Sequence, residues 1–413
     1  MGAAPAADAA EDGPAYTVTE VTGGPLDGLA RQHGMVAMEV TETGSLSDPS
    51  YPRVKRFVRL ALPEGVAYRT ADHLTVLPAN DPELVTRAAK LLQADPETVL
   101  SIVPARPARR GSLAVDRPVS VRELLTHHVE LNHRPNAEQL ALLAELNPCP
   151  PEKAALAAQT PGERTLLDLI EANPALRETL TWPVLLELLP PLRPRHYSVS
   201  SSPAVSPRHV DLMVSLLRDE TSGFRGTGSG HLNAVRPGDT VLARVQPCRD
   251  AFRIGHAPDR PVIMVSAGTG LAPFRGTIAD RRALVESGTP LAPALCYFGC
   301  DAPDADYLHA EELRAAEAVG AVSMRPAFSQ APVDGHRFVQ HRIAADGDEI
   351  WRLLAEGAAV YVCGDGARMA PGVREAFRSV YAAHTPGADD AAAQRWLDAL
   401  MAEGRFVEDV YAG

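Results

Sequence analysis

The segment that decides the fold runs from Arg195 to Pro203 and reads RHYSVSSSP. Alternate side chains of a strand face the same way, so Arg195 and Tyr197 share one face and Ser198 lies on the other. An arginine can bind a pyrophosphate and a tyrosine can stack on a flat ring, which together favour a planar cofactor that carries phosphate. Taken alone, the segment is equally compatible with an ordinary strand that runs into a serine-rich turn.

Two glycine-rich segments further along the chain strengthen the cofactor interpretation. Residues 226–232 read GTGSGHL, in which the glycines leave backbone N–H groups open to phosphate, although the segment alone is more typical of a flexible hairpin. Residues 261–276 read PVIMVSAGTGLAPFRG, an apolar strand that ends in a Gly-Thr-Gly turn with Pro273 suited to the first turn of a helix. A strand, a glycine turn and a helix N-terminus form an anion site that fits a dinucleotide pyrophosphate.

Beyond this turn the chain alternates strands with helices, a rhythm that predicts a parallel sheet with helices on both faces. Cys363, Gly364 and Asp365 fall at the end of one of these strands, where the ligands of doubly wound sheets bind. A single cysteine is usually part of the core, but the glycine turn that follows Cys363 favours a position beside a ligand.

Short strands separated by Gly and Pro are predicted over residues 15–80 and again over 190–255. The interval, residues 81–189, has helical periodicity. We therefore predict an antiparallel β-barrel with an inserted all-helical domain, followed by a doubly wound α/β domain over residues 256–413. Residues 1–14 are Ala-rich and acidic and are predicted to be a linker.

Composition excludes some classes of function. The net charge of -12 argues against a nucleic-acid partner. The five cysteines show no paired metal-ligand spacing, which indicates no metal site and a reducing, cytoplasmic compartment. Apolar runs long enough for a membrane span and the order of a signal peptide are both missing from the sequence, so we expect no membrane association.

Together these motifs resemble the FAD- and NADPH-binding reductase domain of diflavin reductases of the NADPH-cytochrome P-450 reductase type, within the ferredoxin-NADP reductase superfamily. The resemblance runs from near Tyr16 to Gly413 and is greatest to the reductase part of bacterial fused P-450 monooxygenases. It implies that the barrel binds FAD, that the helical insert is the connecting domain of diflavin reductases, and that residues 256–413 form a Rossmann-like NAD(P)H-binding domain. The C-terminal GRFVEDVYAG is similar to the ending of that family.

The resemblance also implies roles for individual residues. Ser198 would hydrogen-bond near flavin N5, and Cys363 would pack beside the nicotinamide. Asp409 would accept a hydrogen bond from Ser198 or Cys363, and Tyr411 would cover the isoalloxazine ring. The implied FAD ligands are Arg195, Tyr197, Ser198, Gly226, Thr227, Ser229 and Tyr411. The implied NADPH ligands are Gly268, Thr269, Gly270, Ser329, Gln330, Arg337, Phe338, Gln340, Cys363 and Asp365. Gly228 and Gly230 replace larger residues of the family, which predicts a looser loop and weaker retention of FAD.

The sequence departs from the family where NADPH is distinguished from NADH. Gln330 stands where the family has Arg, His336 and Phe338 stand where it has Lys and Tyr, and Asp301 falls where relatives often have Arg. Proteins recognise a 2'-phosphate by fixed positive charges and hydroxyl groups. Arg337 lies one position away from the place of the family's Lys and can compensate for its loss. We predict a reduced preference for NADPH, with NADH as a plausible donor.

The resemblance implies electron transfer from FAD to an FMN (flavodoxin-like) domain and on to a P-450 haem domain, since neither kind of segment occurs in this sequence. Those partners can belong to the same natural polypeptide. Two alternatives remain: the flavoprotein component of a sulfite-reductase-like complex, which shares all these motifs, and a non-catalytic docking module that kept the fold.

Overall fold

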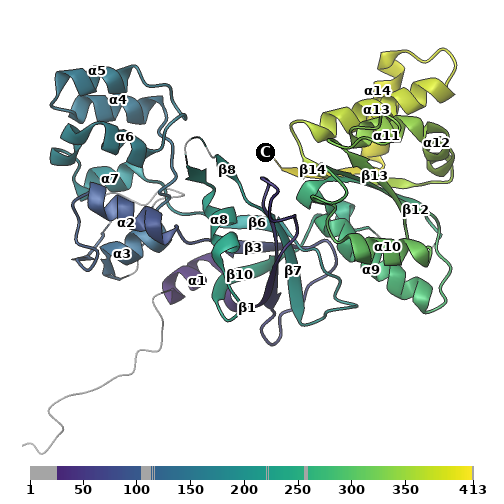
Figure 1. Cartoon of the computed structure of the whole chain (residues 1–413), viewed down its shortest axis with the longest axis horizontal. Helices are drawn as coiled ribbons and strands as arrows, with labels where there is room; N and C mark the ends of the chain where they lie inside the picture. The colour runs from purple at the N-terminus through teal and green to yellow at the C-terminus, as the bar shows by residue number, and fades with distance from the viewer. Residues whose placement is uncertain are drawn as a thin grey trace, which may run out of the picture.

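The computed structural model describes residues 26–103, 113, 115, 117–219, 221, 223–254 and 259–411. The predicted linker at residues 1–14 lies outside them. A β-barrel occupies the middle of the molecule, with a helical region on one side and an α/β domain on the other (Figure 1). The predicted fold class is therefore confirmed, while the domain boundaries stay predictions.

The barrel is a six-stranded sheet in the order β6, β3, β10, β1, β2, β7, and all neighbouring strands are antiparallel. A bridge between Val199 and Leu212 joins the end of β6 to β7 and closes the sheet. Its interior is filled by fully buried side chains such as Val58, Leu60 and Leu74. The strands are β1 (Val36–Ser45), β2 (Lys55–Ala61), β3 (His73–Leu77), β6 (Arg195–Ser198), β7 (His209–Ser215) and β10 (Thr240–Gln246).

Shorter helices and strands lie before, between and after the barrel strands in the chain order. They are helix α1 (Asp27–His33), helix α8 (Thr227–Ala234), the 3-10 turn η3 (Asp250–Phe252) and a small pair of strands, β8 (Arg218–Asp219) and β9 (Phe224–Arg225). The expectation that residues 15–80 contain strands alone was wrong at α1. This helix ends at Gly34, which adopts the left-handed conformation that glycine accommodates.

Helices dominate the chain between β3 and β6, as predicted, and they form a leucine-rich core of their own. Capping boxes at Asn136 and Thr165 fix the starts of α4 and α6. No helix in the described ranges is both long and apolar enough to cross a membrane. The elements are α2 (Pro82–Leu91), β4 (Val99–Leu100), β5 (Val119–Ser120), α3 (Val121–Glu123), the π-helical turn η1 (Leu124–His128), α4 (Ala137–Leu146), α5 (Pro150–Ala157), α6 (Leu166–Ala172), η2 (Pro174–Glu178) and α7 (Trp182–Leu188).

The α/β domain has a five-stranded parallel sheet in the order β13, β12, β11, β14, β15. Alternate residues of β11 pack on opposite faces: Met264 lies in the core with α9 and α10, and Val265 in the core with α11 to α14 (Figure 1). The strands are β11 (Val262–Ala267), β12 (Ala294–Cys300), β13 (Ser323–Phe328), β14 (Ala359–Asp365) and β15 (Phe406–Tyr411). The helices are η4 (Gly268–Leu271), α9 (Ala272–Glu286), α10 (Ala310–Ala318), α11 (Val339–Ala345), α12 (Gly347–Ala355), α13 (Met369–His384) and α14 (Asp390–Ala402).

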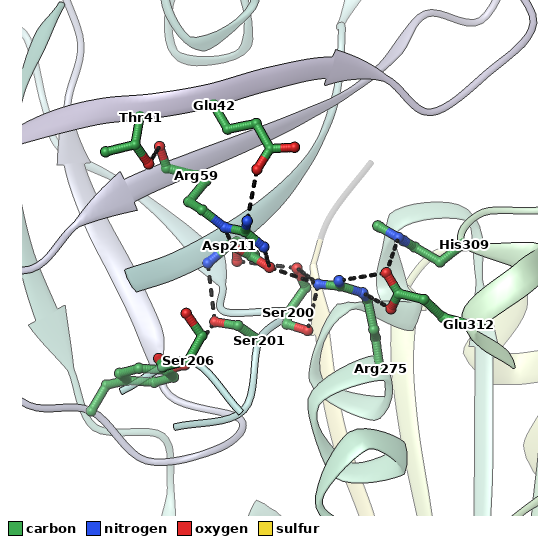
Figure 2. A network of polar contacts seen from close by, with 11 residues as sticks. Thr41, Glu42, Arg59, Ser200, Ser201, Ser206, Asp211, Arg275, His309 and Glu312 are labelled. Carbon is green, nitrogen blue, oxygen red and sulfur yellow. Dashed lines mark hydrogen bonds and ion pairs between the residues drawn. The ribbon is translucent and has the colours of Figure 1, made fainter. Parts of the chain in front are cut away.

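Buried ion pairs join the barrel to the α/β domain. Figure 2 shows Arg275 of α9 between Asp211 of β7 and Glu312 of α10, with Arg59 of β2 on the other side of Asp211. A second pair, Lys55 and Asp306, has an N–O distance of 2.5 Å and is almost completely buried. Breaking such a pair leaves an uncompensated buried charge, so these contacts hold the two domains in one relative position.

Candidate active site

Side chains from two sheets meet where the barrel contacts the α/β domain. Ser198 of β6 lies opposite His73 of β3, and Cys363 of β14 lies opposite Asp409 of β15. The Ser198 side chain lies close enough to the Cys363 thiol to affect its pKa, and His73 Nε2 lies 3.0 Å from Asp409 Oδ2. The structure therefore brings Ser198, Cys363 and Asp409 together, and it adds a histidine to them.

Cys363 is 2% exposed, and this environment determines its chemistry. Burial raises the pKa of its thiol far above the usual range, the nearby Asp409 charge adds to this, and the Ser198 side chain opposes it. The thiol therefore stays protonated at neutral pH and does not act as a thiolate nucleophile. It can fill space beside a flat ring and donate a hydrogen bond.

Tyr411 and the glycine turn lie next to this group. Tyr411 is 48% exposed at the end of β15, and its side chain lies near that of Thr269. A Cβ added to Gly270 would lie 2.3 Å from the carbonyl oxygen of Cys363. Only glycine therefore allows the turn to approach β14 this closely.

A second cluster lies at the start of α8. Arg195 Nη2 donates to Glu130 Oε2 at 2.9 Å, and Thr227 Oγ1 donates to Glu130 Oε1 at 2.5 Å. The N–H groups of the first turn of α8 have no partners within the helix. Together with the Arg195 guanidinium they form a donor-rich cradle that fits a diphosphate, and the Glu130 carboxylate accepts hydrogen bonds from Arg195 and Thr227 within it.

Gly228 and Ser229 also make contacts that support this cradle. A Cβ at Gly228 would lie 2.7 Å from Arg195 Cγ and 2.8 Å from the Tyr197 hydroxyl, so the glycine lets α8 contact β6 closely. The Ser229 hydroxyl accepts from the Leu217 N–H at 3.1 Å and thereby braces the loop. Burial raises the pKa of Tyr197 to about 12, so this ring is neutral and available for stacking.

A cavity of about 550 Å³ opens at the carboxyl ends of β11, β12 and β13, where doubly wound sheets bind their ligands. Its place fits the adenosine end of a nicotinamide dinucleotide. The predicted NADPH ligands in its lining are Gly268, Ser329, Gln330, Arg337, Phe338, Gln340 and Asp365. The other predicted ligands, Thr269, Gly270 and Cys363, are outside that lining and lie beside Tyr411.

Several residues of these sites could not be recognised from the sequence. His73 contacts Asp409, Glu130 contacts Arg195, and Arg53 and Lys55 reach the cavity from the barrel side of the molecule. The only signal for His73, Arg53 and Lys55 was a titratable or charged side chain near the end of a short strand, and Glu130, after η1, had none. Such residues are also typical of ordinary solvent-exposed strand ends.

Comparison with protein families agrees with this geometry. The family described as FAD binding domain matches residues 30–231, and the family described as oxidoreductase NAD-binding domain matches residues 264–375. The chain therefore carries an FAD-binding domain and an oxidoreductase NAD-binding domain.

Two individual proteins are similar to this chain over nearly its whole length. The chain is 34% identical, over 98% of its length, to bifunctional cytochrome P-450/NADPH–P-450 reductase 2 of Bacillus subtilis, of which it covers 39%. It is 34% identical, over 96% of its length, to the bifunctional cytochrome P-450/NADPH–P-450 reductase of Bacillus cereus, of which it covers 38%. The chain thus spans about two fifths of these relatives and is similar to their reductase part.

Proposed function

We propose that this chain takes a hydride from NADPH or NADH onto FAD and passes the electrons singly to an FMN domain and on to a P-450 haem domain. The observation that carries the proposal is the contact between Ser198, on the strand expected to bind the flavin, and Cys363, on the strand beside the nucleotide cavity. FAD, when bound, accepts two electrons as a hydride and releases them one at a time.

The protein's part in hydride transfer is to align the two rings and exclude water. Ser198 and the protonated Cys363 mark the place where the rings would meet. Asp409 provides a negative charge there that favours positive charge developing on the nicotinamide, and His73 holds its carboxylate in place. Tyr411 lies on the exposed side and would move when the nicotinamide stacks, since its side chain is 48% exposed.

The phosphates of the two nucleotides would bind in separate places. In the barrel, Arg195, Thr227 and the first turn of α8 would hold the FAD diphosphate. In the α/β domain, the Gly268–Gly270 turn would hold the dinucleotide diphosphate, and the cavity at the ends of β12 and β13 would hold the adenosine.

The partners are inferred from the relatives. Their names join a cytochrome P-450 to an NADPH–P-450 reductase in one polypeptide, and this chain matches about two fifths of each. Mixing the FAD-loaded chain, a nicotinamide nucleotide and an isolated FMN domain of such a relative should reduce the FMN. Reduction of ferricyanide without any reduction of the FMN domain would count against this partner and leave the hydride step standing.

The hydride step itself is tested by the visible spectrum of the purified, FAD-loaded chain. Anaerobic addition of NADPH or NADH should bleach the flavin absorbance. Asp409→Asn should slow bleaching on the order of 10²-fold by removing a charge at the reacting centre. Asp398→Asn, the same change on the exposed face of α14, should not slow it. A chain that binds FAD but is bleached by neither nucleotide would be a docking module instead.

A further inference from the structure

Asp301 directly follows β12, the second strand of the β11–α9–β12 unit. In dinucleotide-binding units of this kind, an acidic side chain accepts a hydrogen bond from the 2'-hydroxyl of the adenosine ribose. Asp301 is only 7% exposed, and it lines the cavity beside Ser329, which directly follows the neighbouring strand β13. Asp301 therefore occupies a position in the fold at which a side chain would recognise the adenosine ribose.

The Asp301 carboxylate is held by a hydrogen bond at one oxygen and faces a largely exposed arginine at the other. Oδ1 accepts from Ser329 Oγ at 2.5 Å, and Oδ2 lies 3.1 Å from Arg53 Nη1. The Asp301 N–H donates to Asp306 Oδ1 at 2.7 Å. The carboxylate cannot turn away from the cavity without losing the contacts to Ser329 and Arg53.

Two of the four cations that line the cavity are paired with carboxylates. Arg53 faces Asp301, and Lys55 is paired with Asp306. Arg337 Nε donates to the Ser329 carbonyl at 2.8 Å. The remaining charged residues of the lining are Arg368 and Asp365. A 2'-phosphate beside Asp301 would bring two further negative charges to a carboxylate that is already buried, whereas a 2'-hydroxyl can donate to it.

We infer that Asp301 selects a nicotinamide dinucleotide with a free 2'-hydroxyl, so that the chain uses NADH in preference to NADPH. The inference rests on the proposed function, because it names the nucleotide of the same site. Ser329 and Arg53 act as positioning residues that hold the selecting carboxylate.

Calorimetric titration of the purified chain with ADP-ribose and with 2'-phospho-ADP-ribose tests this without any flavin reaction. We expect ADP-ribose to bind at least about tenfold more tightly, which corresponds to one hydrogen bond gained and one repulsion avoided. Asp301→Asn should reduce this ratio by about tenfold. Asp304→Asn, the same change at an exposed residue of the same loop, should leave it unchanged. The ratio of kcat/KM for NADH and NADPH should follow the binding ratio.

Ser329→Ala gives a second variant that keeps the Asp301 charge and removes the donor to Oδ1. It should lower the preference for ADP-ribose, with an unchanged thermal unfolding curve as the control for folding. Tighter binding of 2'-phospho-ADP-ribose by the wild type, or an unchanged ratio in both variants, would overturn the inference alone. Binding of neither compound would overturn the proposed function with it.

Discussion

The guanidinium of Arg275 donates to the carboxylate of Asp211 at 3.0 Å, across the contact between the barrel and the α/β domain (Figure 2). Arg275 lies in the first turns of α9, just after the glycine turn, and it also donates to the Ser200 carbonyl at 3.2 Å. Ser200 follows β6 by two residues. Arg275 therefore helps to position the nucleotide turn relative to the segment that would bind the flavin.

Asp211→Asn should destabilise the chain by about 3 kcal/mol, because Asp211 is 2% exposed and its loss of charge leaves Arg275 and Arg59 without their shared carboxylate. Urea unfolding measures the change. Glu42→Gln removes the exposed partner of Arg59 and should cost less than about 1 kcal/mol. Equal effects of the two substitutions would contradict a structural role for the buried pair.

Glu312 should make the stability of the chain depend on pH in the acid range. Burial alone would raise the pKa of Glu312, but hydrogen bonds from His309 and Arg275 outweigh it and lower the pKa to about 2, from 4.5. A depressed carboxyl pKa stabilises the folded state above pH 4.5, and that stabilisation is lost as the pH falls toward 2.

Unfolding free energies measured between pH 6 and pH 2 should therefore fall less steeply in Glu312→Gln than in the wild type. Glu311→Gln, the same change at the preceding residue, serves as the control and should follow the wild-type curve. Parallel curves for wild type and Glu312→Gln would show that this carboxylate does not contribute.

Gly228→Ala should weaken FAD binding about tenfold, because the new methyl group would displace Arg195 and Tyr197 from their positions on β6. Gly230→Ala is the matched control, since the nearest atom to its added Cβ is Arg225 Cβ at 4.0 Å. It should leave FAD binding unchanged and stabilise α8 slightly. Flavin fluorescence titration measures both, and a tighter complex with Gly228→Ala would support the expected loose loop.

Gly270→Ala should destabilise the α/β domain by about 3 kcal/mol or more, because backbone rather than a movable side chain opposes the added Cβ. Gly347→Ala places its methyl group 3.6 Å from Val380 Cγ2, an ordinary contact, and should be neutral. The thermal unfolding temperatures of the two variants and the wild type measure the difference. A stable Gly270→Ala chain would mean that the turn and β14 can separate.

Local patterns were enough to predict the classes of structure in this chain. Apolar strands with Gly and Pro between them predicted the barrel, helical periodicity predicted the insert, and the alternation after Gly270 predicted the parallel sheet. These features depend on residues that are close together in the sequence, and each is repeated over several turns or strands. The same applies to the glycine turn, whose function follows from its own backbone.

The tertiary structure decided which side chains meet. His73 and Asp409 are 336 residues apart, and Glu130 reaches Arg195 from a different domain. Arg53 contacts Asp301 only because the β1–β2 connection lies against the α/β domain. Such contacts depend on strand register and on how whole domains dock, and a shift of one residue in register turns a side chain to the opposite face. The sequence by itself therefore determined the fold class and the glycine turns, while the active-site contacts and the charge balance of the nucleotide cavity were decided by packing between distant segments.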